Sequence, residues 1–66
     1  MKSVGSEMPV QQQRCRELLK VYRDLGPAGG FGAMMIEQAL QRADRAIIGG
    51  DIVEILRSYE ELKELE

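Results

Sequence analysis

The fold is decided by the stretch Gly26-Pro27-Ala28-Gly29-Gly30-Phe31-Gly32, which interrupts helix-forming sequence on both sides. Gly26 can adopt the left-handed conformation that ends a helix, and Pro27 cannot continue the helical hydrogen bonds. Two interpretations of this stretch stay open. The first is a flexible link. In the second, the next helix begins early with Pro27 in its first turn, and Gly29, Gly32 and Ala33 let another helix backbone approach closely.

The segment before this stretch predicts an amphipathic helix over about 9–25. Pro9 suits the first turn of a helix, because its missing N–H would be unpaired there anyway. Residues 1–8 show no periodicity, so we expect a disordered N-terminal tail, which leaves 9–66 as a single helical domain. The apolar residues of the predicted helix recur at intervals of three and four and share one face: Cys15, Leu18, Leu19, Tyr22 and Leu25.

The segment after the stretch predicts a second helix that ends at 48, before Gly49-Gly50, and starts at 27 or 33 according to the interpretation chosen. Its apolar residues cover much of the circumference, since Met34 and Met35 lie outside the main stripe. A helix of this kind is usually central and contacted from more than one side. Phe31, the only phenylalanine, is expected to anchor the glycine stretch to the core.

A third helix is predicted over about 51–65. Asp51 is a good N-cap, and Glu54 three residues later can complete a capping box. The fold class is therefore all-α, with three short helices arranged as a helical hairpin or a small bundle. The third helix carries a continuous apolar stripe: Ile52, Ile55, Leu56, Tyr59, Leu62 and Leu65.

The small size of the chain favours association with a partner. A domain of 66 residues buries only about 60% of its unfolded surface and usually needs a disulfide, a metal or a second chain. The single cysteine, Cys15, excludes a disulfide within one chain, and the absence of histidine disfavours a zinc site. We therefore expect a homo-oligomer, most simply a homodimer, with no metal and no cofactor.

Charge and hydropathy indicate a cytoplasmic protein with no membrane partner. No apolar run approaches the ~18 residues of a membrane span, and residues 1–8 lack the apolar core of a signal peptide. Residues 10–25 carry four basic and two acidic side chains, whereas residues 51–66 carry six acidic and two basic ones. This complementarity favours antiparallel packing of the first and third helices within one chain, or head-to-tail pairing between two chains.

The residue types argue against an enzyme. Acid–base catalysis at neutral pH usually relies on histidine, which is absent, and Cys15 and Ser58 have no base in a recognisable pattern. The glycine stretch does not match a phosphate-binding loop, because no strand precedes it and the GxGxxG spacing is not met. No catalytic residue is predicted.

A basic stripe on the first helix offers one alternative function. Arg16, Lys20 and Arg23 lie at positions i, i+4 and i+7, so they line one face that can follow phosphates. Glu17 and Asp24 interrupt this surface, and the acidic third helix would repel DNA. Nucleic-acid binding is therefore the second hypothesis, and a purely structural self-association module is the third.

Protein binding is the leading hypothesis. Phe31, Met34 and Met35 cluster around the glycine stretch, and methionine adapts its shape to a partner surface. On the third helix, Tyr59, Leu62 and Leu65 lie between acidic residues and can occupy a groove bordered by basic residues. Each of these two sets of residues can contact either a partner protein or a second copy of the chain.

The chain resembles the small helical accessory proteins of temperate phages and prophages, a group that includes antirepressors and inhibitors of host proteins. The resemblance rests on an acidic chain of fewer than 70 residues, the irregular start Met1 to Met8, and the breaks at Gly26-Pro27 and Gly49-Gly50. It implies an inhibitor that occludes or remodels a partner protein in the host cytoplasm. It transfers no functional residue, because no diagnostic motif is shared.

Overall fold

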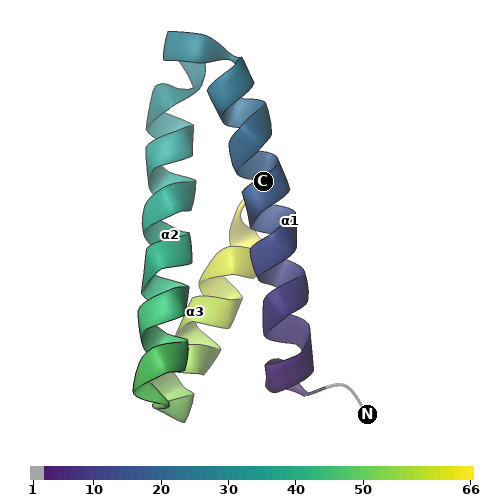
Figure 1. The fold of residues 1–66 in the computed structure, drawn as a ribbon, viewed down its shortest axis with the longest axis vertical. Coiled ribbons are helices and arrows are strands. Elements are labelled where there is room, and N and C mark those ends of the chain that lie inside the picture. The colour runs from purple at the N-terminus through teal and green to yellow at the C-terminus, as the bar shows by residue number, and fades with distance from the viewer. Residues whose placement is uncertain (1–2) are drawn as a thin grey trace.

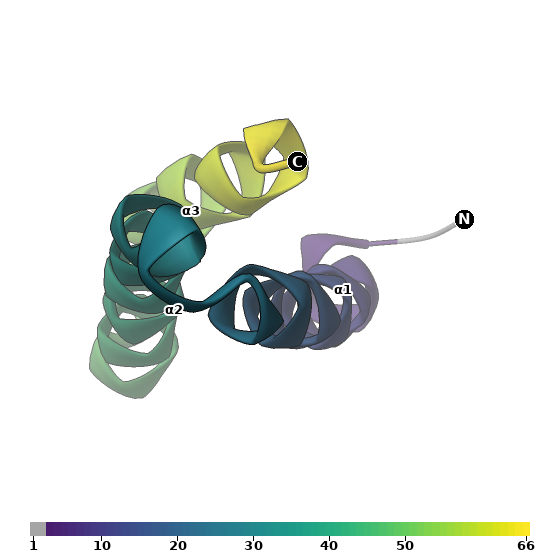
Figure 2. The same cartoon turned by 90° about the horizontal axis from the view of Figure 1, so that it is seen from above.

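The computed structural model describes residues 3–66, which form three α-helices and one short 3₁₀ helix. Helix α1 spans Val4–Asp24, η1 spans Gly26–Gly29, α2 spans Gly30–Gly49 and α3 spans Ile52–Glu64. Helices α1 and α2 form a long antiparallel hairpin (Figure 1), and α3 lies along one face of it, as Figure 2 shows from above. The prediction of an all-helical fold is confirmed.

Helix α1 begins five residues earlier than the sequence pattern predicts. Ser3 is its N-cap: the Ser3 hydroxyl accepts from the Ser6 N–H at 3.4 Å, and the Ser6 hydroxyl accepts from the Ser3 N–H at 3.2 Å. This is a capping box in which serine replaces the usual glutamate. Pro9 lies inside the helix rather than in its first turn, and Met8 is buried. The segment predicted as a tail is thus helical from Val4 onward, and residues 1–2 lie outside the described residues.

The glycine stretch is helical and closely packed rather than a flexible link, but α2 begins at Gly30 and not at 27 or 33, because Pro27 lies in the separate helix η1. Gly26 takes the left-handed conformation, with φ 68°, and η1 leads directly into α2. A Cβ atom on Gly29 would overlap the backbone carbonyl of Tyr22, and one on Gly32 would lie 2.5 Å from the Tyr22 ring. The glycines therefore allow α1 and α2 of the same chain to approach closely at this end of the hairpin.

The connection between α2 and α3 follows the sequence prediction more closely. Gly50 ends α2 in the left-handed conformation, with φ 71°. Asp51 is the N-cap of α3, and its carboxylate accepts from the backbone N–H of Val53 at 2.9 Å. Glu54 does not close a capping box, because its carboxylate pairs with Arg57 at 3.1 Å.

The core lies where the three helices meet. Its centre is Leu62 of α3, which is fully buried together with Cys15 of α1 and Ala43 of α2. Helix α3 has 13 residues and is about 20 Å long, whereas α1 and α2 are each about 30 Å long. Figure 1 shows that α3 ends well before the η1 end of the hairpin, so that end is a two-helix structure.

Polar contacts hold α3 on the hairpin. Arg14 of α1 donates to the carbonyl oxygens of Leu62 at 2.6 Å and Leu65 at 2.9 Å, which places a positive charge at the C-terminal end of α3. The Tyr22 hydroxyl donates to the Glu66 carbonyl oxygen at 2.6 Å. Figure 1 shows that α1 and α3 run in the same direction, so the expected antiparallel packing of these two helices is wrong. The positive charge of α1 contacts the carbonyl end of α3 instead.

Candidate protein-binding surfaces

The predicted binding residues of α3 face inward. Leu62 is 0% exposed, and Tyr59 and Leu65 are half-buried against the core. A partner could reach Leu62 only if α3 left the hairpin. The apolar stripe of α3 is therefore the core stripe, and it holds the helix on its own chain.

The predicted binding residues of α2 face outward. Phe31 is 72% exposed, and Met34 and Met35 are also exposed. The expectation that Phe31 anchors the glycine stretch to the core is wrong, because Tyr22 does this: its ring packs against Gly32. Phe31 lies on the first turn of α2 between Gly29 and Gly32, the two residues that pack on Tyr22, and its own side chain faces solvent.

A surface on α3 outside the predicted binding residues combines apolar and acidic side chains. We call it the outer face of α3 and define it as Val53, Leu56, Glu60 and Glu64. Val53 is 51% exposed and Leu56 is 46% exposed on the first two turns, and the two glutamates are exposed on the same side further along. Among the described residues, Glu64 makes no ion pair.

A sequence signal for this outer face exists. The core stripe of α3 follows the spacing Ile55, Ser58, Tyr59, Leu62, and Val53 and Leu56 lie off it. The predicted apolar stripe includes Leu56, which lies four residues after Ile52, yet Ile52 and Leu56 are both exposed at the edge of the buried stripe. Val53 and Leu56 are therefore large apolar residues of α3 that the core of this chain does not use.

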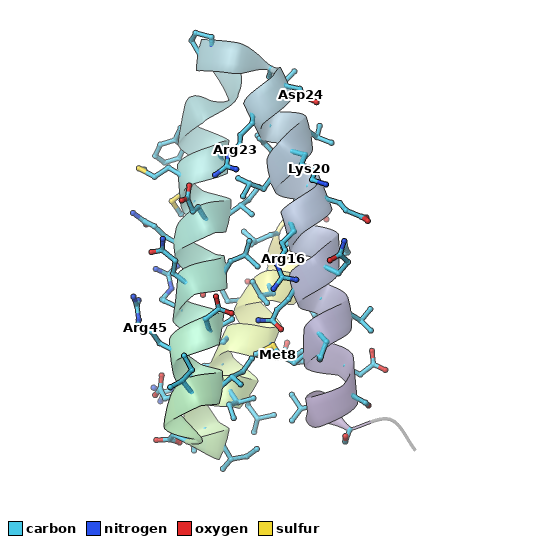
Figure 3. All side chains as sticks on the ribbon, viewed as in Figure 1. Met8, Arg16, Lys20, Arg23, Asp24 and Arg45 are labelled. Carbon is cyan, nitrogen blue, oxygen red and sulfur yellow. The ribbon has the colours of Figure 1, made fainter. Side chains whose placement is uncertain are left out.

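The predicted basic stripe of α1 is only partly free. Figure 3 shows Arg16, Lys20 and Arg23 along α1, with Arg23 directed toward α2. Arg23 pairs with Glu37 at 3.1 Å, whereas Arg16 and Lys20 are exposed. Arg16 and Lys20 form no ion pair with residues 3–66, so this surface presents two unpaired cations to solvent rather than three.

The groove between α2 and α3 also contains arginines, but most of its charge is neutralised within the chain. Arg42 makes a two-pronged ion pair with Glu61, at 3.0 and 2.7 Å, which raises the pKa of the Arg42 guanidinium. Arg57 pairs with Glu54 at 3.1 Å on the same groove. Arg45, which also lines it, has no ion-pair partner among residues 3–66.

The only thiol is chemically shielded. Cys15 is buried, and burial raises the pKa of its thiol, while the charge of Arg14 lowers that pKa by a smaller amount. Its sulfur lies 3.5 Å from the Leu62 carbonyl oxygen. Because the thiolate is the nucleophilic form, Cys15 serves packing at neutral pH. Within residues 3–66, no three acidic, cysteine or histidine side chains gather in a way that could hold a metal ion.

Comparisons with models of protein families, with curated proteins and with solved structures found no match for this chain. No helix within the described residues is long and apolar enough to cross a membrane. The surfaces of the chain itself therefore carry the information about function.

Proposed function

We propose that this protein is a non-enzymatic regulator that binds another protein through the outer face of α3. The supporting observation is the composition of that face: half-exposed Val53 and Leu56 are followed on the same side by Glu60 and Glu64. An apolar contact beside negative charge suits a partner surface on which apolar side chains adjoin lysine and arginine. The charge guides the encounter, and the apolar contact supplies most of the affinity.

The mode of action we propose is occlusion. Proteins bind nucleic acid through basic surfaces that include neighbouring apolar or aromatic groups. An acidic helix on such a surface competes with the phosphate backbone and excludes it. This is how an antirepressor-like accessory protein of a temperate phage, the group that the chain resembles, would act in the host cytoplasm.

The apolar half of the surface is tested by affinity capture from a bacterial lysate with quantitative mass spectrometry. We expect the wild-type chain to retain a partner at one-to-one stoichiometry and the Leu56→Asp variant to lose it. The matched control is Val21→Asp, which places the same charge on a similarly exposed apolar site of α1. A partner that binds Leu56→Asp as well as it binds the wild type would contradict the proposed surface.

The charged half is tested with the captured partner in purified form. Glu60→Lys and Glu64→Lys should slow association and reduce its dependence on salt, because they remove the attraction to a basic surface. Glu17→Lys makes the same charge change at an exposed position of α1 and should leave the association rate with the partner unchanged. Nucleic-acid binding is the competing outcome: a DNA mobility shift by the wild-type chain that Arg16→Gln and Lys20→Gln abolish would replace the present proposal.

A further inference from the structure

Helix α2 carries a second stripe on the side away from its core residues. The stripe follows the spacing 3-4-3-4-3, which keeps its members on one helix face, as in the seam of a coiled coil. All its members are exposed, and Ile48 is 86% exposed. We call this the outer stripe of α2, and its residues are Phe31, Met34, Gln38, Gln41, Arg45 and Ile48.

We propose that the outer stripe of α2 pairs with the same stripe of a second copy of this chain, with the two α2 helices antiparallel. A two-fold axis between Gln38 and Gln41 places each Phe31 against Ile48 of the second copy. The same axis places each Met34 against Arg45 and each Gln38 against Gln41. Large apolar side chains then meet at both ends of the contact, and amides that can hydrogen-bond to each other meet at its centre.

The orientation follows from Arg45. This residue has no ion-pair partner among the described residues, and Figure 3 shows it on the side of α2 away from α1. In a parallel pair, Arg45 would face Arg45 of the second copy, and the two charges would repel each other. In the antiparallel pair, its apolar stem covers Met34 of the second copy while its guanidinium stays in solvent.

The pairing leaves the rest of the molecule unchanged. Helices α1 and α3 pack against the core residues of α2, and within the outer stripe only Arg45 also borders the groove to α3, so the stripe stays open to a second α2. The contact is about 26 Å long, from Phe31 to Ile48. Six side chains from each copy are fewer than the roughly 20–30 residues a side of a standard interface, so we expect a weak dimer with a dissociation constant on the order of 100 µM.

Sedimentation velocity over about 1 to 500 µM tests this pairing. We expect the wild-type chain to change from monomer to dimer within that range. Ile48→Asp acts at both ends of the symmetric contact and should weaken the dimer about 100-fold or more. Val10→Asp makes a similar change at an exposed site of α1 and should dimerise like the wild type. A wild-type chain that stays monomeric, or equal loss of dimer in both variants, would overturn the proposal.

Disulfide trapping tests the orientation. Phe31→Cys and Ile48→Cys lie about 26 Å apart along one helix, which is too far for a bridge within a chain, and native Cys15 is buried. After mixing the two single variants and allowing exchange, oxidation should yield mainly the disulfide that joins residue 31 of one chain to residue 48 of the other. Efficient trapping of the Phe31→Cys variant with itself would show a parallel pair and overturn the antiparallel arrangement.

The α2 pairing is independent of the function proposed above, because it uses α2 and not the outer face of α3. An Ile48→Asp monomer that still captures the partner would leave that function intact. Conversely, a Leu56→Asp chain that dimerises but captures nothing would separate the two surfaces experimentally.

Discussion

The close approach of α1 and α2 at the glycine stretch makes a strong prediction about two neighbouring glycines. A Cβ atom on Gly29 would lie 2.8 Å from the Tyr22 carbonyl carbon and closer still to its oxygen. Carbon atoms prefer about 3.5–4.0 Å, so the two backbones would have to separate by about 1 Å. A Cβ atom on Gly30 would meet no atom within 4 Å, and Gly30 already has helical angles, φ −61° and ψ −42°.

The two alanine substitutions, at Gly29 and at Gly30, should change the free energy of unfolding in opposite directions. Overpacking costs about 1–3 kcal/mol, and we take the upper end because a backbone carbonyl cannot rotate away as a side chain can. Replacing glycine with alanine also raises the free energy of unfolding by about 0.4–1 kcal/mol, because alanine restricts the unfolded chain. Gly29→Ala should therefore destabilise by about 2–3 kcal/mol, whereas Gly30→Ala should stabilise by about 0.4–1 kcal/mol.

Thermal unfolding followed by circular dichroism measures both effects. For a domain of this size, 1 kcal/mol corresponds to about 4–8 °C in Tm, so Gly29→Ala should lower Tm by roughly 10–20 °C. Gly30→Ala should raise Tm by a few degrees and serves as the matched control. If Gly29→Ala melts at or above the wild-type temperature, the close packing of this stretch on Tyr22 is refuted.

Three further predictions concern the core and the attachment of α3. Leu62→Ala should destabilise by about 2–5 kcal/mol in urea unfolding, whereas Leu56→Ala on the exposed side of the same helix should change stability by less than about 0.5 kcal/mol. Arg14→Met removes the donors to the last carbonyls of α3, so it should lower the free energy of unfolding by about 1–3 kcal/mol and speed amide exchange in the last turn of α3. Arg16→Met is the control and should change neither quantity. Cys15 holds its proton more tightly when folded, because burial raises the pKa of its thiol. The contribution of Cys15 to the free energy of unfolding is therefore complete below the ordinary thiol pKa and is lost as pH rises through the raised pKa. The midpoint of urea unfolding should fall over this pH range in the wild type, and Cys15→Ala should lack this fall.

Much of the helical organisation is predictable because it depends on local chemistry. Gly26 and Gly50 end their helices in the left-handed conformation that glycine adopts without strain, and Asp51 caps α3 as its side chain allows. The start of α1 escapes prediction because Ser3 and Ser6 form a capping box without an acidic residue. Apolar periodicity gives no signal over residues 4–8 either, since Met8 is the only buried residue there.

The surfaces are less predictable because inward and outward stripes have the same helical period. Spacing and residue type predict both Leu62 and Phe31 as contact residues, yet one is the centre of the core and the other is mostly exposed. The difference arises from tertiary geometry. Gly29 packs on the Tyr22 backbone and Gly32 on the Tyr22 ring, so these two glycines face α1 while Phe31 between them faces solvent.

The distribution of side-chain size on α2 connects the fold to the proposed association. Of its six buried residues, four are alanines, and only Ile36 and Leu40 are large. The large apolar residues Phe31, Met34 and Ile48 face solvent instead. A helix that served only its own core would place large side chains inward, where each contributes more by burial. Small residues inside let α1 and α3 approach closely, but they limit the apolar area that one chain can bury. In the pairing proposed above, a second copy on the outer stripe would supply further burial, and mass action would then couple the stability of this small domain to its assembly.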